Sequence, residues 1–473
     1  MYRDRGFGFF PAFRLFFLLL MVAVFPVRAE SMVSVVPNTV RIGLAQGVQY
    51  QDFHVQGRYR AVDLNSGKYL ADVLPGEKWQ VRYNGGTMQL YRNGVQEAVA
   101  GNSLGLEQAG IPVAVLGGDG TIGKPGSDDS LYVISGQGDI SGLGIDGGEI
   151  SLLSDSGVST LRGGAGQNLV AIASGGGDRL YRGNMEFRLA SGGITVINEL
   201  PLEEYLYGVL PGEMPSSWPI EAQKAQAVAA RSYALANLGA YSSYGFDLMS
   251  GQMSQVYGGY DAEQPAATRA VDETRGMVLL CRGEPVSAFF HSSSGGYIEN
   301  AEDVWRDPLE YISSKADPFD KNDKYYNWLV DYDQKQLVSQ LALKKALYNK
   351  PGMPERVFSA VDDIRVLEMT ASGARVKRMS ITGTGDDGSP MTVEIANADA
   401  VRSVLGLKSA LFTMKKTTTP EGGLKSVSFT GSGYGHGLGM SQYGALGMAN
   451  RGYNYRDILG YYYNNCQVGL LTE

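Results

Sequence analysis

The residue pattern of this chain changes sharply near Ile197, and that change limits the folds it can adopt. From Ser34 to about Ile197, short runs of β-forming residues alternate with glycine-rich turns, and no segment has the spacing of an amphipathic helix. Alanine-rich helical segments follow, and the stretch from Tyr325 to Pro420 mixes a helix with alternating strands. The sequence therefore predicts an α+β protein with a β-rich, glycine-rich N-terminal region, then a mixed α/β domain carrying an inserted smaller α+β subdomain.

The N-terminus has the layout of a secretory signal peptide. Arg3, Arg5 and Arg14 come before or at the start of the apolar run 15–27, and Ala29 follows in a small-residue cleavage pattern. The run is shorter than the roughly 20 apolar residues that an ordinary membrane-spanning helix needs. We predict cleavage after Ala29 and an exported protein without a stable membrane span; an uncleaved N-terminal anchor is the alternative.

The length of the chain predicts more than one domain, because a single hydrophobic core seldom serves so many residues. We expect a signal peptide (1–29), a β-rich accessory region (30–181) and a catalytic domain (182–473) with a subdomain at about 325–420. Without residues 1–29 the chain has 37 Lys and Arg against 48 Asp and Glu, a formal charge of −11. This balance argues against a nucleic-acid partner, which requires a basic surface.

The cysteines and histidines are few. Cys281 and Cys466 are too few for a disulfide-built scaffold, and whether they form one bridge is left open. His54, His291 and His436 are too widely spaced for a recognisable zinc signature.

Two predicted helices flank the strongest catalytic candidate. Residues 201–209 suit a short helix with acidic residues at its positive end, where compensation of the helix dipole is the favoured interpretation. Residues 220–238 form a long alanine-rich helix for which Ser216 or Ser217 can supply the cap. On this second helix the small residues recur on one stripe, which predicts close packing against a neighbour; they include Ala222, Ala225 and Ala229.

Glu213 lies between two prolines, in Val209-Leu-Pro-Gly-Glu-Met-Pro, and close to Trp218. A stiff backbone would hold its carboxyl in place, and apolar neighbours would raise its pKa toward that of a proton donor. Glu213 is therefore a candidate general acid. A carboxylate that accepts backbone hydrogen bonds at a helix start is the alternative left open by the residues alone.

Longer motifs add a family resemblance. The stretch 198–234, which contains Glu213, resembles the SpoIID/LytB family almost word for word. Further likeness lies in Phe289-Phe-His-Ser-Ser-Ser-Gly-Gly, in Val401-Arg-Ser-Val-Leu-Gly-Leu-Lys-Ser and in Gly433-Tyr-Gly-His-Gly-Leu-Gly-Met-Ser-Gln-Tyr-Gly-Ala. It spans about 182–471 and is weaker in the N-terminal β region.

The resemblance implies a peptidoglycan lytic transglycosylase without a cofactor, exported to the periplasm or the cell wall. Such an enzyme cuts the bond between N-acetylmuramic acid and N-acetylglucosamine, preferentially in glycan whose stem peptides have been removed. The catalytic glutamate of the family falls on Glu213. Most glycosidases need two carboxylates, whereas here one would act as acid and then as base and leave a 1,6-anhydro end.

Eight further residues match family positions or line its glycine-rich loops, and we predict that they bind substrate. They are Lys224, Gln226, Arg231, His291, Ser294, Tyr434, His436 and Gln442. For Lys224 and Arg231 an ion pair or an exposed helix surface is an equal alternative. For His291 a structural histidine is the favoured alternative. Some relatives have a cysteine of a zinc site soon after this histidine; this chain has Ser292, Ser293 and Ser294 there, so we predict no metal.

Two other functions remain open. Relatives described as amidase enhancers suggest a non-catalytic module that binds glycan, or a cell-wall amidase, and stimulates that amidase. The third interpretation is a hydrolase in which Glu213 works with a second acid, Glu299 or Asp303.

Overall fold

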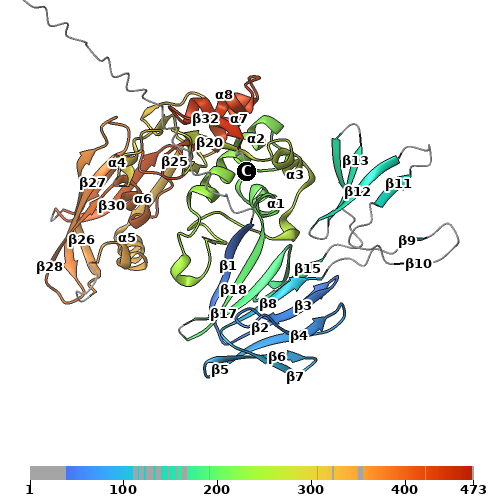
Figure 1. Ribbon diagram of the computed structural model, residues 1–473. Coiled ribbons are helices and arrows are strands. Elements are labelled where there is room, and N and C mark those ends of the chain that lie inside the picture. Colours follow the sequence, from blue (N-terminus) through green and yellow to red (C-terminus); the bar gives the residue numbers. More distant parts are fainter. Residues whose placement is uncertain are drawn as a thin grey trace, which may run out of the picture. The chain divides into compact units, whose positions relative to one another are not determined.

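The computed structural model describes residues 39–109, 168–190, 192–305, 307–321, 324–349, 355–420 and 422–470, together with the backbone of short strands between residues 115 and 161. The predicted signal peptide lies outside the described residues. The chain is an α+β protein, as the sequence predicts (Figure 1). Among the described residues, no helix has both the length and the apolar character that crossing a membrane requires.

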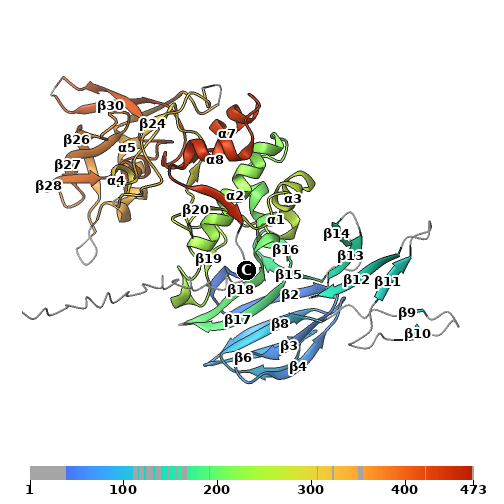
Figure 2. The same ribbon diagram turned by 45° about the horizontal axis from the view of Figure 1, so that its top comes forward.

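Two antiparallel sheets make up most of the N-terminal part. Their strands are β1 (Thr39–Val48), β2 (Tyr50–Gln56), β3 (Tyr59–Asp63), β4 (Lys68–Val73), β5 (Trp79–Asn84), β6 (Thr87–Arg92), β7 (Val95–Ala100), β8 (Ser103–Gln108), β15 (Leu169–Ser174), β16 (Gly177–Tyr181), β17 (Asn184–Ala190), β18 (Gly193–Pro201) and β19 (Leu248–Met249). One sheet has the order β19-β1-β18-β17-β8-β3-β4, in which only β19 pairs in parallel, and the other has the order β16-β15-β2-β5-β6-β7 (Figure 2). Consecutive strands β17 and β18 pair antiparallel.

Six more strands lie between these two groups in the sequence. They are β9 (Val115–Leu116), β10 (Ile122–Gly123), β11 (Leu131–Ile134), β12 (Ile140–Asp146), β13 (Glu149–Ser154) and β14 (Gly157–Leu161). The first two pair with each other, and the other four form an antiparallel meander. The domain boundary predicted at 181/182 stays a prediction, and strands from both sides of it share the seven-stranded sheet.

Helices α1 (Leu202–Glu213), α2 (Ile220–Ala236) and α3 (Pro265–Asp272) follow the large sheet. Helix α1 runs four residues beyond its predicted end, and Pro211 lies inside it. Glu213 is therefore the last residue of α1 and does not lie at the start of α2. The predicted serine cap of α2 is wrong: Pro219 is the N-cap, and the Gln223 amide instead donates to the carbonyls of Ser216 and Trp218.

Helix α2 is buried along two faces. Ala227, Ala230 and Ala234 belong to the core formed with the large sheet and α1. The predicted small-residue stripe (Ala222, Ala225 and Ala229) is fully buried in a second core, which includes residues of the C-terminal helices. Close packing of this stripe is thus confirmed. Alanine allows it because its side chain ends at Cβ and keeps neighbouring elements close.

The second core takes its other elements from two distant stretches of the chain. They are β20 (Met277–Cys281), β21 (Glu284–Pro285), β22 (Phe290–His291), β23 (Tyr297–Ile298), α4 (Ala301–Val304), β24 (Lys315–Ala316), β31 (Met440–Ser441), α7 (Gln442–Ala449), α8 (Tyr455–Tyr462) and β32 (Gln467–Leu470). Strand β22 pairs in parallel with β31, and β20 pairs antiparallel with β32. Residues 440–470 are thereby tied to residues 277–291.

A third core lies within the intervening segment, drawn in orange in Figure 1. Its elements are β25 (Trp328–Asp333), α5 (Gln334–Leu343), β26 (Phe358–Met369), β27 (Val376–Gly385), β28 (Pro390–Ala396), α6 (Ala398–Val404), β29 (Phe412–Thr418) and β30 (Leu424–Gly431). The helix predicted in the stretch from Tyr325 to Pro420 is present as α5, and a capping box of Asp333 and Gln336 explains its start. The short 3-10 turns are η1 (Ser242–Tyr244), η2 (Tyr260–Ala262) and η3 (Lys345–Leu347).

Two helical glycines provide a matched test of this packing. A Cβ on Gly447 in α7 would lie 2.0 Å from the Phe319 carbonyl oxygen, whereas a Cβ on the exposed Gly460 in α8 would meet no atom within 4 Å. Gly447→Ala should therefore lower the free energy of unfolding by about 1–3 kcal/mol. Gly460→Ala should raise it by about 0.5–1 kcal/mol because alanine favours the helix. Urea unfolding checks both, and equal effects would contradict the packing.

Candidate functional site

Glu213 is held at the C-terminal end of α1, where it is partly buried. Its side-chain Oε1 accepts a hydrogen bond of 2.9 Å from the backbone N–H of Val256. Its backbone carbonyl accepts a hydrogen bond, also of 2.9 Å, from the Gln442 amide at the start of α7. Two segments far apart in the sequence therefore fix both the backbone and the carboxyl group of this residue.

Burial raises the pKa of the Glu213 carboxyl, and the hydrogen bond from Val256 opposes that rise without cancelling it. The last carbonyls of a helix carry partial negative charge, which also disfavours a carboxylate at this end. The raised pKa makes the protonated form available nearer neutral pH, as a proton donor needs. The sequence-based expectation that apolar surroundings would raise the pKa agrees with this direction.

Gln442 and Gln226 lie beside this carboxyl-bearing helix end. The Gln442 amide nitrogen is 3.4 Å from the Oε1 of Gln226 in α2, and both side chains are buried. The Gln226 amide nitrogen has no hydrogen-bond partner. These contacts join α1, α2 and α7 at one point. Gln442 therefore holds the backbone of Glu213, and Gln226 contacts Gln442 in turn. We call these three residues the Glu213 frame.

The rings of His291 and His436 are neighbours, with centroids 5.4 Å apart and ring planes inclined at 57°. The Nδ1–H of His291 donates to the Leu438 carbonyl, and the Nδ1 of His436 accepts from the Leu438 N–H, each at 3.0 Å. Burial lowers the pKa of His291 well below its usual range and that of His436 to about 4. Both rings are therefore neutral at neutral pH. Trp305 packs 5.2 Å from the His436 ring.

Arg231 and Lys224 are engaged in ion pairs. The Arg231 side chain is 1% exposed, and its guanidinium forms a two-pronged pair with Glu203 (2.6 and 2.9 Å) while donating to the carbonyls of Val271 and Met277. The ammonium group of Lys224 lies 3.0 Å from Glu221 and 2.7 Å from Glu273. Both residues therefore form ion pairs, and the prediction that they bind substrate stays a prediction.

Ser294 and Tyr434 lie on neighbouring backbone segments but differ in exposure. Ser294 is fully buried, and its N–H and hydroxyl both donate to one oxygen of Asp320. Tyr434 is 41% exposed, and its backbone exchanges two hydrogen bonds with Ser293. Of the eight predicted substrate contacts, Lys224, Tyr434 and His436 keep exposed surface, whereas Gln226, Arg231, His291, Ser294 and Gln442 are buried.

Glu299 and Asp303, the candidate second acids, are both buried and paired. Glu299 lies 3.5 Å from the guanidinium of the buried Arg375, and burial raises its pKa. Burial also acts to raise the pKa of Asp303, but its hydrogen bonds with Lys377 and with the Ala371 N–H outweigh that effect and lower it. Within the described part of the chain, neither carboxyl forms a hydrogen bond or ion pair with Glu213.

The residue-level prediction missed the segment 250–257, which carries the Val256 N–H. Its contact with Glu213 is made by backbone, and a backbone donor leaves no signature in residue types. Buried Gln255 anchors the segment, since it accepts from the Tyr205 hydroxyl and donates to the Ala230 carbonyl. Ser254 hydrogen-bonds Tyr233. The donor can be identified only from the tertiary structure, which brings this loop back to the end of α1.

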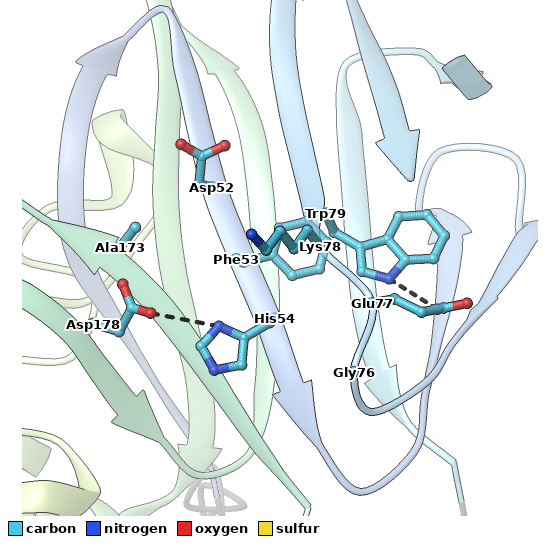
Figure 3. A pocket seen from close by; sticks show the side chains of 9 residues that line it. All are labelled: Asp52, Phe53, His54, Gly76, Glu77, Lys78, Trp79, Ala173 and Asp178. Atoms are coloured by element: carbon cyan, nitrogen blue, oxygen red, sulfur yellow. Dashed lines mark hydrogen bonds and ion pairs between the residues drawn. The ribbon is translucent and has the colours of Figure 1, made fainter. Parts of the chain in front are cut away.

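No three His, Cys, Asp or Glu side chains converge on a possible metal position within the described part of the chain. The expected absence of a metal remains a prediction. The third histidine, His54, lines a cavity of about 410 Å³ in the N-terminal β region (Figure 3). There His54 lies 3.6 Å from Asp178, and the Trp79 indole donates to Glu77. None of the predicted site residues lines this cavity.

Comparisons with known proteins place the Glu213 segment within a family. A family model described as Stage II sporulation protein matches residues 190–280, and a domain of unknown function, DUF8618, matches residues 302–439. The chain is 31% identical over 287 residues to stage II sporulation protein D of Bacillus subtilis, covering 58% of this chain and 75% of that protein.

Two further relatives are similar at about the same level. The amidase enhancer of Bacillus subtilis is 32% identical over 294 residues, which is 54% of this chain but only 39% of that protein. An uncharacterised protein of Brachyspira hyodysenteriae is 30% identical over 296 residues, covering 61% and 72%.

Helices α1 and α2, including Glu213 at the end of α1, lie inside the segment that the sporulation-protein model matches. This match links the chain to proteins of cell-wall processing. The chain belongs to the SpoIID/LytB family.

The buried ion pair of Arg231 makes a testable claim about stability. Arg231→Gln should lower the free energy of unfolding by about 3–5 kcal/mol, because it leaves the Glu203 carboxylate without its charged partner. Arg269→Gln is the matched control: it breaks the pair with Glu273 at a side chain 70% exposed, and should change stability by less than about 1 kcal/mol. Chemical denaturation of both variants measures the difference. Comparable losses would contradict a structural role for Arg231.

Proposed function

We propose that this protein is an exported peptidoglycan lytic transglycosylase, with Glu213 as its single acid/base residue. The substrate would be the bond between N-acetylmuramic acid and N-acetylglucosamine in glycan strands. The observation that supports this most is one partly buried carboxyl with a raised pKa, fixed through Oε1 by the Val256 N–H. Family membership supports the same substrate class.

The geometry suggests how one carboxyl serves both steps. With Oε1 occupied by Val256, the proton would reside on Oε2 and pass to the glycosidic oxygen as the C1–O bond breaks. The Val256 N–H then stabilises the carboxylate. That carboxylate removes the proton from the C6 hydroxyl of the muramic acid residue, whose oxygen bonds to C1. The product is a 1,6-anhydro end, Glu213 regains its proton, and no water is consumed.

This mechanism needs no second carboxylate, and the other acids that could supply one are engaged in ion pairs. Glu203 is paired with Arg231, and Glu299 and Asp303 are buried beside Arg375 and Lys377. This disfavours the two-acid hydrolase.

Exposure divides the eight predicted substrate contacts into two roles. We assign direct contact with the sugar to Tyr434, His436 and Lys224, which keep exposed surface. The buried members would act by shaping the site; they are Gln226, Arg231, His291, Ser294 and Gln442.

A second candidate function is stimulation of a cell-wall amidase. The amidase enhancer of Bacillus subtilis gives this alternative its support, although the chain spans only 39% of that protein. The two functions differ in what they need from Glu213. Stimulation of an added amidase would persist in Glu213→Gln, whereas transglycosylation would not.

The test of the enzyme is product analysis with peptide-free glycan. Glu213→Gln should lower the rate by about a hundredfold to ten-thousandfold, since it removes general acid and base together. In the unchanged protein, activity should fall as the pH rises through the raised pKa of Glu213, because the protonated form starts the reaction. Mass spectrometry identifies the product, as an anhydro end lacks the water that a hydrolysed end contains.

Glu302→Gln is the control for that test, since Glu302 is an exposed carboxylate in α4. It should leave the rate unchanged. Equal activity of Glu213→Gln and the unchanged protein, or products with hydrated ends, would reject the mechanism.

A further inference from the structure

Four aromatic rings form a continuous row that starts beside the Glu213 frame. They are Trp218, Tyr443, Tyr325 and Tyr434, and we call them the aromatic row. Successive ring centroids lie 4.9, 6.2 and 4.8 Å apart. Four separate segments supply them: the connection before α2, helix α7, residues 324–327 and the glycine-rich loop 433–439.

The row is attached to the Glu213 frame at one end and open to solvent at the other. Trp218 follows Glu213 by five residues, and Tyr443 follows Gln442, whose amide holds the Glu213 carbonyl. Tyr434 is 41% exposed, and the other three rings are partly exposed. Rings that serve only to fill a core are buried completely, as Tyr462 is.

Two lysines flank the middle of the row. The ammonium nitrogens of Lys324 and Lys408 lie 4.8 and 5.4 Å from the centre of the Tyr325 ring. The Lys408 carbonyl accepts from the Gly435 N–H at 2.9 Å, which fixes this residue beside the Tyr434 loop. The whole chain has a net charge of −8, so two lysines beside partly exposed aromatic rings are a local exception to its acidic character.

Aromatic faces pack against the C–H faces of sugar rings, and ammonium groups bind carboxylates. Each N-acetylmuramic acid residue carries a lactyl carboxyl group, which is an uncharged amide when a stem peptide is attached and a free carboxylate when it is not. We propose that the aromatic row is a glycan-binding subsite and that Lys324 and Lys408 bind free lactyl carboxylates. This subsite rests on the proposed function, and its two lysines would select strands without stem peptides.

The test measures binding without cleavage, in the Glu213→Gln protein. The probes are a peptide-free tetrasaccharide of alternating N-acetylglucosamine and N-acetylmuramic acid, and the same compound with its lactyl carboxyls converted to amides. Replacing both lysines by methionine should weaken binding of the free-acid probe about tenfold and leave the amide probe unchanged. Tyr325→Leu should weaken both probes. Lys415→Met, an exposed lysine on β29, is the matched control and should change neither.

Equal weakening of both probes by the double lysine variant, or no weakening, would overturn the subsite. Thermal melting of each variant shows that a loss of binding is not a loss of folding. The two proposals fail separately: a protein that shows the binding pattern but yields no anhydro ends would reject only the transglycosylase. One that yields anhydro ends without preference for the free acid would reject only the lysine subsite.

A separate observation concerns the two cysteines. The antiparallel ladder of β20 and β32 ends at the pair Leu280 and Gln467, and the next residue of each segment, Cys281 and Cys466, would face each other in the same register. Their thiols are free and hydrogen-bond each other, and Cys281 also contacts Glu310. Directly facing residues of such a ladder lie within the Cα separation that a disulfide spans.

We also infer that Cys281 and Cys466 form a disulfide that fastens the C-terminal strand to β20. An external disulfide such as oxidised glutathione would be attacked by the half-buried Cys466 thiolate, releasing one glutathione thiol. The Cys281 thiolate would then attack the mixed disulfide and release the second. Two protein thiols are oxidised and one glutathione disulfide is reduced to two thiols. Burial raises the pKa of Cys466 to about 12, so this exchange should be slow at neutral pH.

The test is prolonged incubation of the full protein with oxidised glutathione at pH 8.5, followed by mass mapping of peptides without reduction. We expect a linked pair of peptides containing Cys281 and Cys466, and a melting temperature higher by a few degrees that reduction reverses. Cys281→Ser should show neither change. A lasting glutathione adduct on Cys466 with Cys281 still free would overturn the bridge, as would a linked protein with an unchanged melting temperature.

Discussion

The burial of helix α2 along two faces is the constraint on which the rest of the structure depends. One side packs with the large sheet and α1, and the other packs with α7 and α8 in a separate core. Because most of the positions that α2 buries in these two cores are alanines, both neighbours approach closely, and the end of α1 is brought to the start of α7. A larger side chain at Ala225 or Ala229 would have to displace one of those helices.

This arrangement makes the Glu213 carboxyl both desolvated and accessible, two properties that seldom occur together at a protein surface. Its carboxyl is desolvated enough for the pKa to rise, yet it retains partial exposure and one strong backbone donor. The donor stabilises the charged form without abolishing the rise. A carboxyl that must give up a proton and later take one back benefits from that balance, because neither protonation state is strongly trapped.

Near the glycine-rich loop, buried charged groups are paired and the two histidines stay uncharged. The buried Arg375 pairs with Glu299 and donates to the Ser294 carbonyl, and together with burial it keeps His291 and His436 neutral. Such a network favours one arrangement of the glycine-rich loop that carries Tyr434. The polar residues of this region therefore provide rigidity around the partly exposed aromatic and lysine side chains.

Residue types and spacing were enough to predict the start of the alanine-rich helix at Ile220 and the small-residue stripe, because these depend on local preference and on one helical period. They marked Glu213 only as a candidate. The sequence could not determine that α1 continues through Pro211, since neighbouring elements stabilise that last turn. Nor could it distinguish an exposed Arg231 from one buried against Glu203. The Val256 N–H, the facing cysteines and the aromatic row arise only when distant segments meet, and that meeting is decided by tertiary packing.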